Sequence, residues 1–178
     1  MMKKYILGLD IGGTSMKWGA YATSHSRLDE KAIVEGSEPT LKGNPKFLHG
    51  LSNLVDNIAN KFDMDFTLGA IGIALPGRFI GDNHDIIAAH TAHNLCTTED
   101  RGAFDNFPMV TALKKHLPSH TPLRVQNDAV VQMLGQLHNE KIDEQISIDE
   151  VVGYIGPGTG LGGGFAVKTE PRSYEIIT

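Results

Sequence analysis

The stretch Leu7-Gly8-Leu9-Asp10-Ile11-Gly12-Gly13-Thr14-Ser15-Met16-Lys17-Trp18-Gly19 predicts a strand, a tight glycine turn and a second strand. Residues 5–9 form a short apolar run that is typical of a buried strand. Met16, Trp18 and Ala20 then alternate with the residues between them, in the two-residue period of a strand. Because glycine has no Cβ, the backbone at the turn can bend sharply and approach a ligand closely.

This turn suits the binding of an anion. Successive backbone amides in a glycine turn can form a concave nest for a phosphate. The carboxylate of Asp10 beside such a nest needs a cation between the two negative charges, and Mg²⁺ is the usual partner of nucleotide phosphates. The alternative is a hairpin turn that needs glycine only for its backbone conformation.

A second glycine stretch repeats the pattern. Residues 151–155 form an apolar strand, residues 156–164 read Gly-Pro-Gly-Thr-Gly-Leu-Gly-Gly-Gly, and residues 165–167 return to a strand. Two such loops facing each other could clasp a polyphosphate from both sides. Residues 158–163 also satisfy G-x-G-x-x-G, but a dinucleotide site requires a helix after the loop, and no helix start follows here.

Two further strands end in polar or turn-forming residues. Residues 68–75 form a buried strand that ends at Pro76-Gly77, and residues 123–126 form a strand that ends at Asn127-Asp128. Ligands of open α/β sheets gather beyond the carboxyl ends of strands, so we expect Pro76-Gly77 near Asp10. The alternatives are a plain turn at Pro76-Gly77 and a helix N-cap at Asp128, since residues 129–137 have helical spacing.

The remaining pattern predicts an α/β lobe followed by the beginning of a second. Residues 32–34 complete an antiparallel meander, residues 37–45 form a loop, and helices cover residues 46–62 and 108–116. The acidic stretch 139–150 is predicted to connect a first lobe, residues 1–138, with the opening strands of a second, residues 151–178. Residues 168–178 show no clear pattern.

Histidines gather between the two strands that carry the candidate site residues. His84, His90, His93 and Cys96 raise the hypothesis of a zinc site. Their spacing differs from that of the usual zinc-ligand pairs, and the chain has one cysteine. The spacing therefore favours the simpler interpretation that these side chains line a loop.

Composition excludes several classes of protein. The chain has 178 residues and a formal net charge of -5, which gives no basic face for nucleic acid. A single cysteine excludes an intrachain disulfide and fits a reducing compartment. No apolar run is long enough to span a bilayer. We therefore expect a cytoplasmic protein with neither nucleic-acid nor membrane partners.

Four motifs in this order resemble the ROK family of sugar kinases, within the actin-like ATPase superfamily. They are Asp10-Ile-Gly-Gly-Thr14, Gly72-Ile-Ala-Leu-Pro-Gly77, Asn127-Asp128-Ala129 and Gly158-Thr-Gly-Leu-Gly-Gly-Gly164. The resemblance implies a ribonuclease H-like lobe with a mixed five-stranded sheet, an antiparallel meander followed by parallel strands, and flanking helices. It also implies transfer of the ATP γ-phosphate to a hydroxyl of a hexose or amino sugar.

The resemblance assigns a role to each matching residue. Asp128 is the implied general base, Asp10 holds Mg²⁺ through water, and Asn127 binds the sugar. Pro76, Gly77 and Asn94 are implied to line the sugar pocket together with Asn127 and Asp128. The implied nucleotide-binding residues are Asp10, Gly12, Gly13, Thr14, Lys17, Gly158, Thr159, Gly160 and Gly162.

This chain departs from the family in two ways. Ser15 stands where many members have lysine, with Lys17 two positions on, and Gln136 stands where an acid is common. The family's zinc cluster, its Glu-x-x-His and its adenine pocket have no match. We therefore expect either a missing second lobe or a homo-oligomer. The alternatives are a non-catalytic sugar-sensing protein and an isolated interaction lobe whose hairpin pairs with another chain.

Overall fold

The computed structural model describes residues 3–24, 27–28, 31–62, 66–81, 85–138, 140–157 and 161–177. These residues fall into two compact units, residues 1–126 and residues 127–178. The expected lobe boundary at residue 138 lies inside the second unit, because the helix before it packs on the strands that follow it. Among the described residues, no helix has both the length and the apolar character needed to cross a bilayer.

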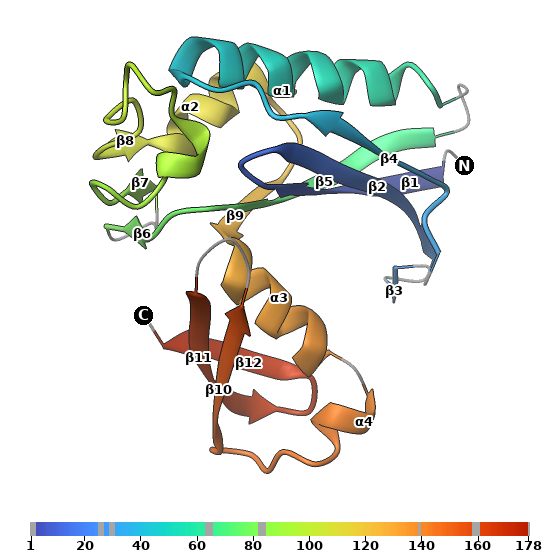
Figure 1. Ribbon diagram of the computed structural model, residues 1–178. Helices are drawn as coiled ribbons and strands as arrows, with labels where there is room; N and C mark the ends of the chain where they lie inside the picture. The colour runs from blue at the N-terminus through green and yellow to red at the C-terminus, as the bar shows by residue number, and fades with distance from the viewer. Residues whose placement is uncertain are drawn as a thin grey trace. The chain divides into compact units, whose positions relative to one another are not determined.

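The first unit is built on a mixed sheet (Figure 1). Its strand order is β3-β2-β1-β5-β9, with β4 also paired to β2. The sheet therefore contains the five expected strands and one more, the two-residue strand β3. β1 pairs antiparallel with β2 and parallel with β5. The bounds are β1 Lys3–Ile11, β2 Ser15–Ser24, β3 Arg27–Leu28, β4 Val34–Pro39, β5 Phe66–Leu75 and β9 Leu123–Asn127.

The helix α1, Asn44–Ala59, covers one face of this sheet (Figure 1). Alternate residues of β1 from Tyr5 to Ile11 are buried, as the two-residue period predicts, and they share one core with the buried side of α1. The helix α2, Met109–His116, packs beside α1 and buries Met109 and Leu113. Both helices begin and end close to where the sequence predicts them. The buried residues of α1 are Phe47, Leu48, Leu51, Leu54, Val55 and Ile58.

The prediction for the third strand is wrong in its bounds. The apolar run at residues 32–34 suggested the strand, but β4 continues to Pro39 through residues expected to form a loop. The strand has no apolar alternation because it lies at the edge of the sheet and is held to β2 by its backbone. Three short strands were also missed between β5 and α2: β6 Phe79–Ile80, β7 Ile86–Ile87 and β8 Phe107–Pro108.

The second unit is a three-stranded antiparallel sheet with one helix on it. The sheet order is β10-β11-β12, with bounds Val151–Pro157, Leu161–Glu170 and Ser173–Ile177. The helix α3, Asp128–Leu137, packs Met133 and Leu137 against Ala166 of β11. The short helix α4, Glu140–Asp143, lies in the stretch expected to be a connector, and β12 lies in the stretch with no clear pattern.

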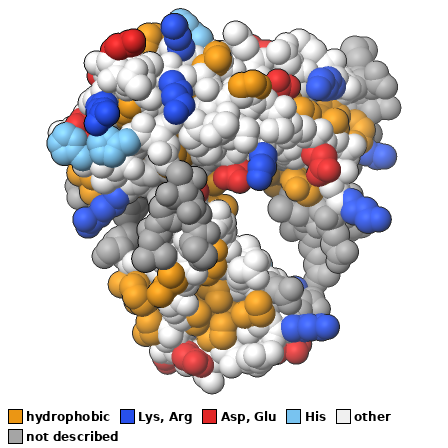
Figure 2. All heavy atoms as spheres, viewed as in Figure 1, with side chains coloured by type: hydrophobic (Ala, Val, Ile, Leu, Met, Phe, Trp, Pro, Cys, Tyr) orange, Lys and Arg blue, Asp and Glu red, His pale blue; other side chains and the backbone are white. Residues whose placement is uncertain are grey.

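The other face of this second sheet is apolar and open. Four side chains that share this face by register are exposed: Val151, Ile155, Phe165 and Ile177, with exposed fractions of 57%, 74%, 58% and 48%. Hydrophobic side chains gather over these strands in Figure 2. We refer to these four residues as the bare apolar face.

Candidate functional site

The glycine turn of the first unit is held by hydrogen bonds around it. The amide of Gly12 donates to the carbonyl oxygen of Ser15 at 2.9 Å, which closes the turn between β1 and β2. The hydroxyl of Thr40 donates to the carbonyl oxygen of Gly12 at 2.7 Å, and the amide of Thr40 donates to the carbonyl oxygen of Thr14 at 3.0 Å. The Gly12 amide therefore serves the turn. Within the described part of the chain, no hydrogen bond engages the amides of Gly13 and Thr14.

Close approach to Asn94 explains the glycine at position 13. A Cβ on Gly13 would lie 2.9 Å from the Cβ of Asn94, closer than such atoms come in proteins. Neither Gly12 nor Gly13 has a positive φ, so contact with a second loop and not turn geometry requires glycine at position 13. The structure thus brings the glycine turn and Asn94 together, although they are far apart in the sequence.

The loop that carries Asn94 is anchored within the first unit by the residue that follows Asn94. Asn94 belongs to the 3-10 turn His93–Leu95, in which Leu95 is fully buried. The carbonyl oxygen of Leu95 accepts a hydrogen bond of 2.9 Å from the amide of Gly43, just before α1. Asn94 itself is exposed. A buried neighbour and a backbone anchor therefore hold an exposed amide side chain beside the glycine turn.

The Pro76-Gly77 turn lies at the same edge of the sheet. Asp10 is directly opposite Ala74 in the parallel pairing of β1 with β5, so Pro76 follows two residues beyond that pair. Gly77 has φ of +119°, a conformation that favours glycine, and a Cβ there would lie 3.3 Å from that of Ala92. The expectation that Pro76-Gly77 lies near Asp10 thus agrees with the strand register.

An aspartate that the sequence analysis did not single out fixes the loop before Asn94. Asp105 accepts a hydrogen bond of 2.7 Å from the amide of His90, and its other oxygen lies 3.1 Å from Nδ1 of the same histidine. His90 has φ of +60°, which is uncommon for a residue other than glycine. The rings of His90 and His93 stack with their centroids 6.0 Å apart. An acid fifteen residues away gives no local signal in the sequence.

The hypothesis of a zinc site gains no support from this loop. Among the residues that the structure describes, no group of three or more histidine, cysteine or acidic side chains is arranged to hold a metal ion. His84 lies outside the described residues. Cys96 is buried, and its thiol donates to the carbonyl oxygen of Ala92 at 3.5 Å.

In the second unit, Asn127 and Asp128 begin the helix α3. Asn127 is the N-cap, and its Oδ1 accepts hydrogen bonds from the amides of Ala129 and Val130 at 3.0 and 3.2 Å. Asp128 is the first helical residue, and its Oδ1 accepts from the amide of Ala129 at 2.8 Å. The alternative of an N-cap aspartate is therefore wrong, since the neighbouring asparagine is the cap. Both side chains are half-buried.

Packing explains part of the second glycine stretch. A Cβ on Gly162 would lie 2.7 Å from the Cβ of Ala129, and one on Gly164 would lie 3.3 Å from Cε of Met133. These glycines let β11 approach α3 closely. Gly158, Thr159 and Gly160, the other predicted phosphate-binding residues of this stretch, lie outside the described residues.

A buried ion pair also holds the second unit together. Lys168 Nζ lies 3.1 Å from Oδ1 of Asp143, and the two side chains are 6% and 8% exposed. The same ammonium donates to the carbonyl oxygens of Asp143 and Ile146, and the hydroxyl of Tyr174 donates to Asp143 at 2.6 Å. Burial and the Asp143 carboxylate raise the pKa of Tyr174 to about 12, and the hydrogen bond from Tyr174 helps to lower the pKa of Asp143.

Comparisons with known proteins place this fold among the sugar kinases. No family model matches the chain. It aligns at 96% of its length with a ROK family glucokinase from Streptomyces griseus, solved with glucose and AMPPNP, at a TM-score of 0.65 and 21% identity. A ROK family transcriptional regulator homologous to the E. coli MLC protein gives a TM-score of 0.67 at 15% identity. The chain therefore shares its fold with these ROK family structures, as the motifs predicted.

The sequence comparison found curated relatives that are named N-acetyl-D-glucosamine kinase. The chain is 28% identical over 162 residues to N-acetyl-D-glucosamine kinase from Vibrio parahaemolyticus serotype O3:K6, covering 89% of this chain. The kinase of the same name from Pectobacterium carotovorum subsp. carotovorum is 27% identical over 164 residues. These findings confirm the resemblance to sugar kinases. The chain spans about half the length of these curated relatives, 45% and 46%.

Proposed function

We propose that this chain carries part of the active site of an ATP-dependent sugar kinase that phosphorylates a hexose or an amino sugar. The observation that carries the proposal is the contact between Asn94 and Gly13 beside the end of β1. It joins a loop suited to a polar substrate to a turn suited to a phosphate, at the edge of the sheet where Asp10 lies. Three separate parts of the sequence therefore converge on one place.

In the first unit, the roles follow from the chemistry of the groups present. The amides of Gly13 and Thr14 would donate to a phosphate, while the amide of Gly12 holds the turn closed. Asp10 is exposed at the end of β1, and its carboxylate oxygens suit Mg²⁺, which usually keeps several of its waters. Lys17 is opposite Asp10 in the pairing of β1 with β2 and would add positive charge. Asn94, Pro76 and Gly77 would line the sugar pocket.

In the second unit, Asp128 is proposed as the general base. Its Oδ1 accepts a hydrogen bond from the amide of Ala129, which orients the carboxylate at the start of α3. Transfer forms a bond between the hydroxyl oxygen and the γ-phosphorus and breaks the bond from phosphorus to the leaving ADP oxygen, while the proton passes to Asp128. Asn127, whose Oδ1 caps the helix, is proposed to bind the sugar.

Full activity is proposed to require more polypeptide than these 178 residues. The chain aligns with less than half of its curated relatives, and the bare apolar face is of the kind that a folded protein covers. An open site also excludes little water from the reacting groups. The names of the relatives make N-acetyl-D-glucosamine the first sugar to test.

The test measures binding and turnover separately. In a polypeptide long enough to match its relatives, Mg²⁺-ATP with a panel of hexoses and N-acetylhexosamines should give ADP release that depends on the sugar, and Asp128→Asn should lower turnover by about 10²–10⁴-fold. Calorimetry of each ligand alone then detects a site that binds without turnover. ADP release that needs no sugar, or that survives Asp128→Asn unchanged, would contradict the proposal.

The second candidate function is a sugar sensor without catalysis. The similarity in fold to a ROK family transcriptional regulator favours it, because that TM-score matches the value for the glucokinase. A sensor would bind sugar with an affinity that Mg²⁺-ATP does not change. A kinase would show affinities for the two ligands that depend on each other, because their sites adjoin.

A further inference from the structure

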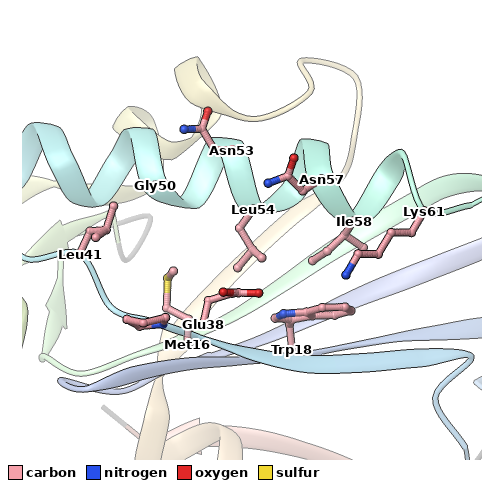
Figure 3. Close-up of a pocket in the computed structure, with 11 residues that line it drawn as sticks. Met16, Trp18, Glu38, Leu41, Gly50, Asn53, Leu54, Asn57, Ile58 and Lys61 are labelled. Atoms are coloured by element: carbon pink, nitrogen blue, oxygen red, sulfur yellow. The ribbon is translucent and has the colours of Figure 1, made fainter.

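A groove in the first unit lies away from the candidate site, between α1 and the edge strand β4. Its volume is about 530 Å³, and its lining runs along α1 from Gly50 to Ile58 and includes Lys61 just beyond the helix. In Figure 3, Leu54 and Ile58 of α1, together with Lys61 just beyond its end, point toward Met16, Trp18 and Glu38 on the strands. The groove is apolar in its depth and carries one acid and one base at its rim.

The strand β4 presents an open backbone edge beside this groove. In the described part of the chain, β4 pairs with β2 and with no strand on its other side. The Thr40 amide bonds to the Thr14 carbonyl, so Glu38, Gly36 and Val34, at two-residue steps, direct their backbone groups to β2. The backbone groups of Ser37 and Glu35 therefore point outward, away from the sheet.

Trp18 forms the floor of the groove near this edge. Gly36 is opposite Trp18 in the strand pairing, and a Cβ on Gly36 would lie 2.5 Å from Cζ2 of the indole. Glycine at this position thus lets the indole reach across β4. Trp18 is 5% exposed, and the ammonium of Lys61 lies over its ring, 5.0 Å from the centroid. A chain lying along β4 would meet this indole with its alternate side chains.

The geometry points to a binding site for an extended peptide that adds a strand to the outer edge of β4. Main-chain hydrogen bonds to an open edge give affinity, and pockets for alternate side chains give specificity. The part of α1 that lines the groove, from Gly50 to Ile58, is about 12 Å long at 1.5 Å per helical residue, which matches about four residues of strand. Pro39 has no amide hydrogen, so the pairing ends there.

The lining also sets the chemistry of the peptide. Leu54 and Trp18 in the lining favour apolar side chains at alternate positions, and Leu41, which is 48% exposed, extends the apolar rim. Glu38 lies near the C-terminal end of β4, and its carboxylate favours a basic side chain of the peptide at that position. An antiparallel peptide would place its first residue opposite Glu38. The matching sequence is therefore a basic residue followed by polar and apolar residues in alternation.

The experiment uses acetyl-Lys-Thr-Leu-Thr-Leu-amide and follows the emission of Trp18, the one tryptophan of the chain. Binding should shift this emission in a saturable way. Methylating the amide nitrogens of both threonines removes the hydrogen bonds to Ser37 and Glu35 and should weaken binding about tenfold or more. Methylating the leucine amides, which would point away from β4, should change affinity little.

A matched pair of protein variants tests the edge itself. Ser37→Pro removes the outward amide hydrogen, whereas Ser37→Ala keeps it, so the proline variant should bind about tenfold more weakly than the alanine variant. The emission of Trp18 without peptide and the circular dichroism of each variant show whether the unit remains folded. Equal binding of both methylated peptides, equal binding by both variants, or no saturable shift would each overturn the proposal.

Discussion

The two units of this protein differ in how completely they bury the apolar side chains of their sheets. The first covers one face of its sheet with α1, and on the other face of β1 the apolar Ile6 is half-buried while Lys4 and Asp10 are exposed. The second packs α3 on one face of its sheet and leaves Ile155 and Phe165 on the other face more than half exposed. The first unit therefore has the larger apolar core, whereas the second combines a small apolar cluster with one buried ion pair.

The largest expected effect comes from breaking that ion pair. Lys168→Met leaves the carboxylate of Asp143 buried without its ammonium, which should destabilise the second unit by about 3–5 kcal/mol. Hydrogen exchange read by mass spectrometry should show lost protection in residues 127–178, while the unfolding midpoint followed by Trp18 emission stays constant. Lys115→Met, which removes an exposed lysine, is the control. An equal change in both units would mean that they unfold as one.

Removing equivalent aliphatic side chains from the two units compares a filled core with the bare apolar face. Leu51→Ala, at a fully buried position of α1, should cost about 2–5 kcal/mol. Ile155→Ala, at a side chain that is 74% exposed, should change stability by less than about 0.5 kcal/mol. Chemical denaturation with circular dichroism measures both. A large cost at Ile155 would show that this face is covered in solution, and light scattering would then reveal whether copies associate.

A glycine that permits helix packing should resist a single added methyl group. Gly162→Ala places a Cβ against that of Ala129 and should destabilise the second unit by about 1–3 kcal/mol. Gly135→Ala in α3, where a Cβ meets nothing within 4 Å, should stabilise the helix by about 0.5–1 kcal/mol. Thermal unfolding measures both. The double variant Gly162→Ala/Ala129→Gly should recover part of the loss, and no recovery would place the strain elsewhere.

The smallest effect is the pH dependence of the second unit. The folded pKa of Tyr174 is raised from 10.0 to about 12, so its contribution to stability is complete below pH 10 and falls as pH rises toward about 12. The pKa of Asp143 is lowered, so its contribution is complete above the ordinary carboxyl pKa and falls as pH drops through the folded value. Unfolding midpoints across pH should show the alkaline loss in the natural chain and a weaker one in Tyr174→Phe. An unchanged profile would exclude Tyr174 as its source.

The sequence by itself determined the elements whose residues repeat with a clear period. The alternation in β1 and the apolar side of α1 gave the core of the first unit, and the four motifs gave the class of fold. Asp10, Pro76 and Gly77 were placed at one edge of the sheet by a general rule for parallel strands, with which the register agrees. These features are local or follow from topology, which is why one chain suffices to predict them.

The tertiary structure decided what depends on contacts between distant residues. Asn94 stands against Gly13, Asp105 holds His90, and Lys168 finds Asp143 twenty-five residues away, with no periodic signal for any of these pairs. The edge strand β4 was misplaced because its backbone, rather than an apolar pattern, holds it in the sheet. Only the fold could show which glycines serve packing, since the space that a Cβ would fill depends on neighbours from other elements.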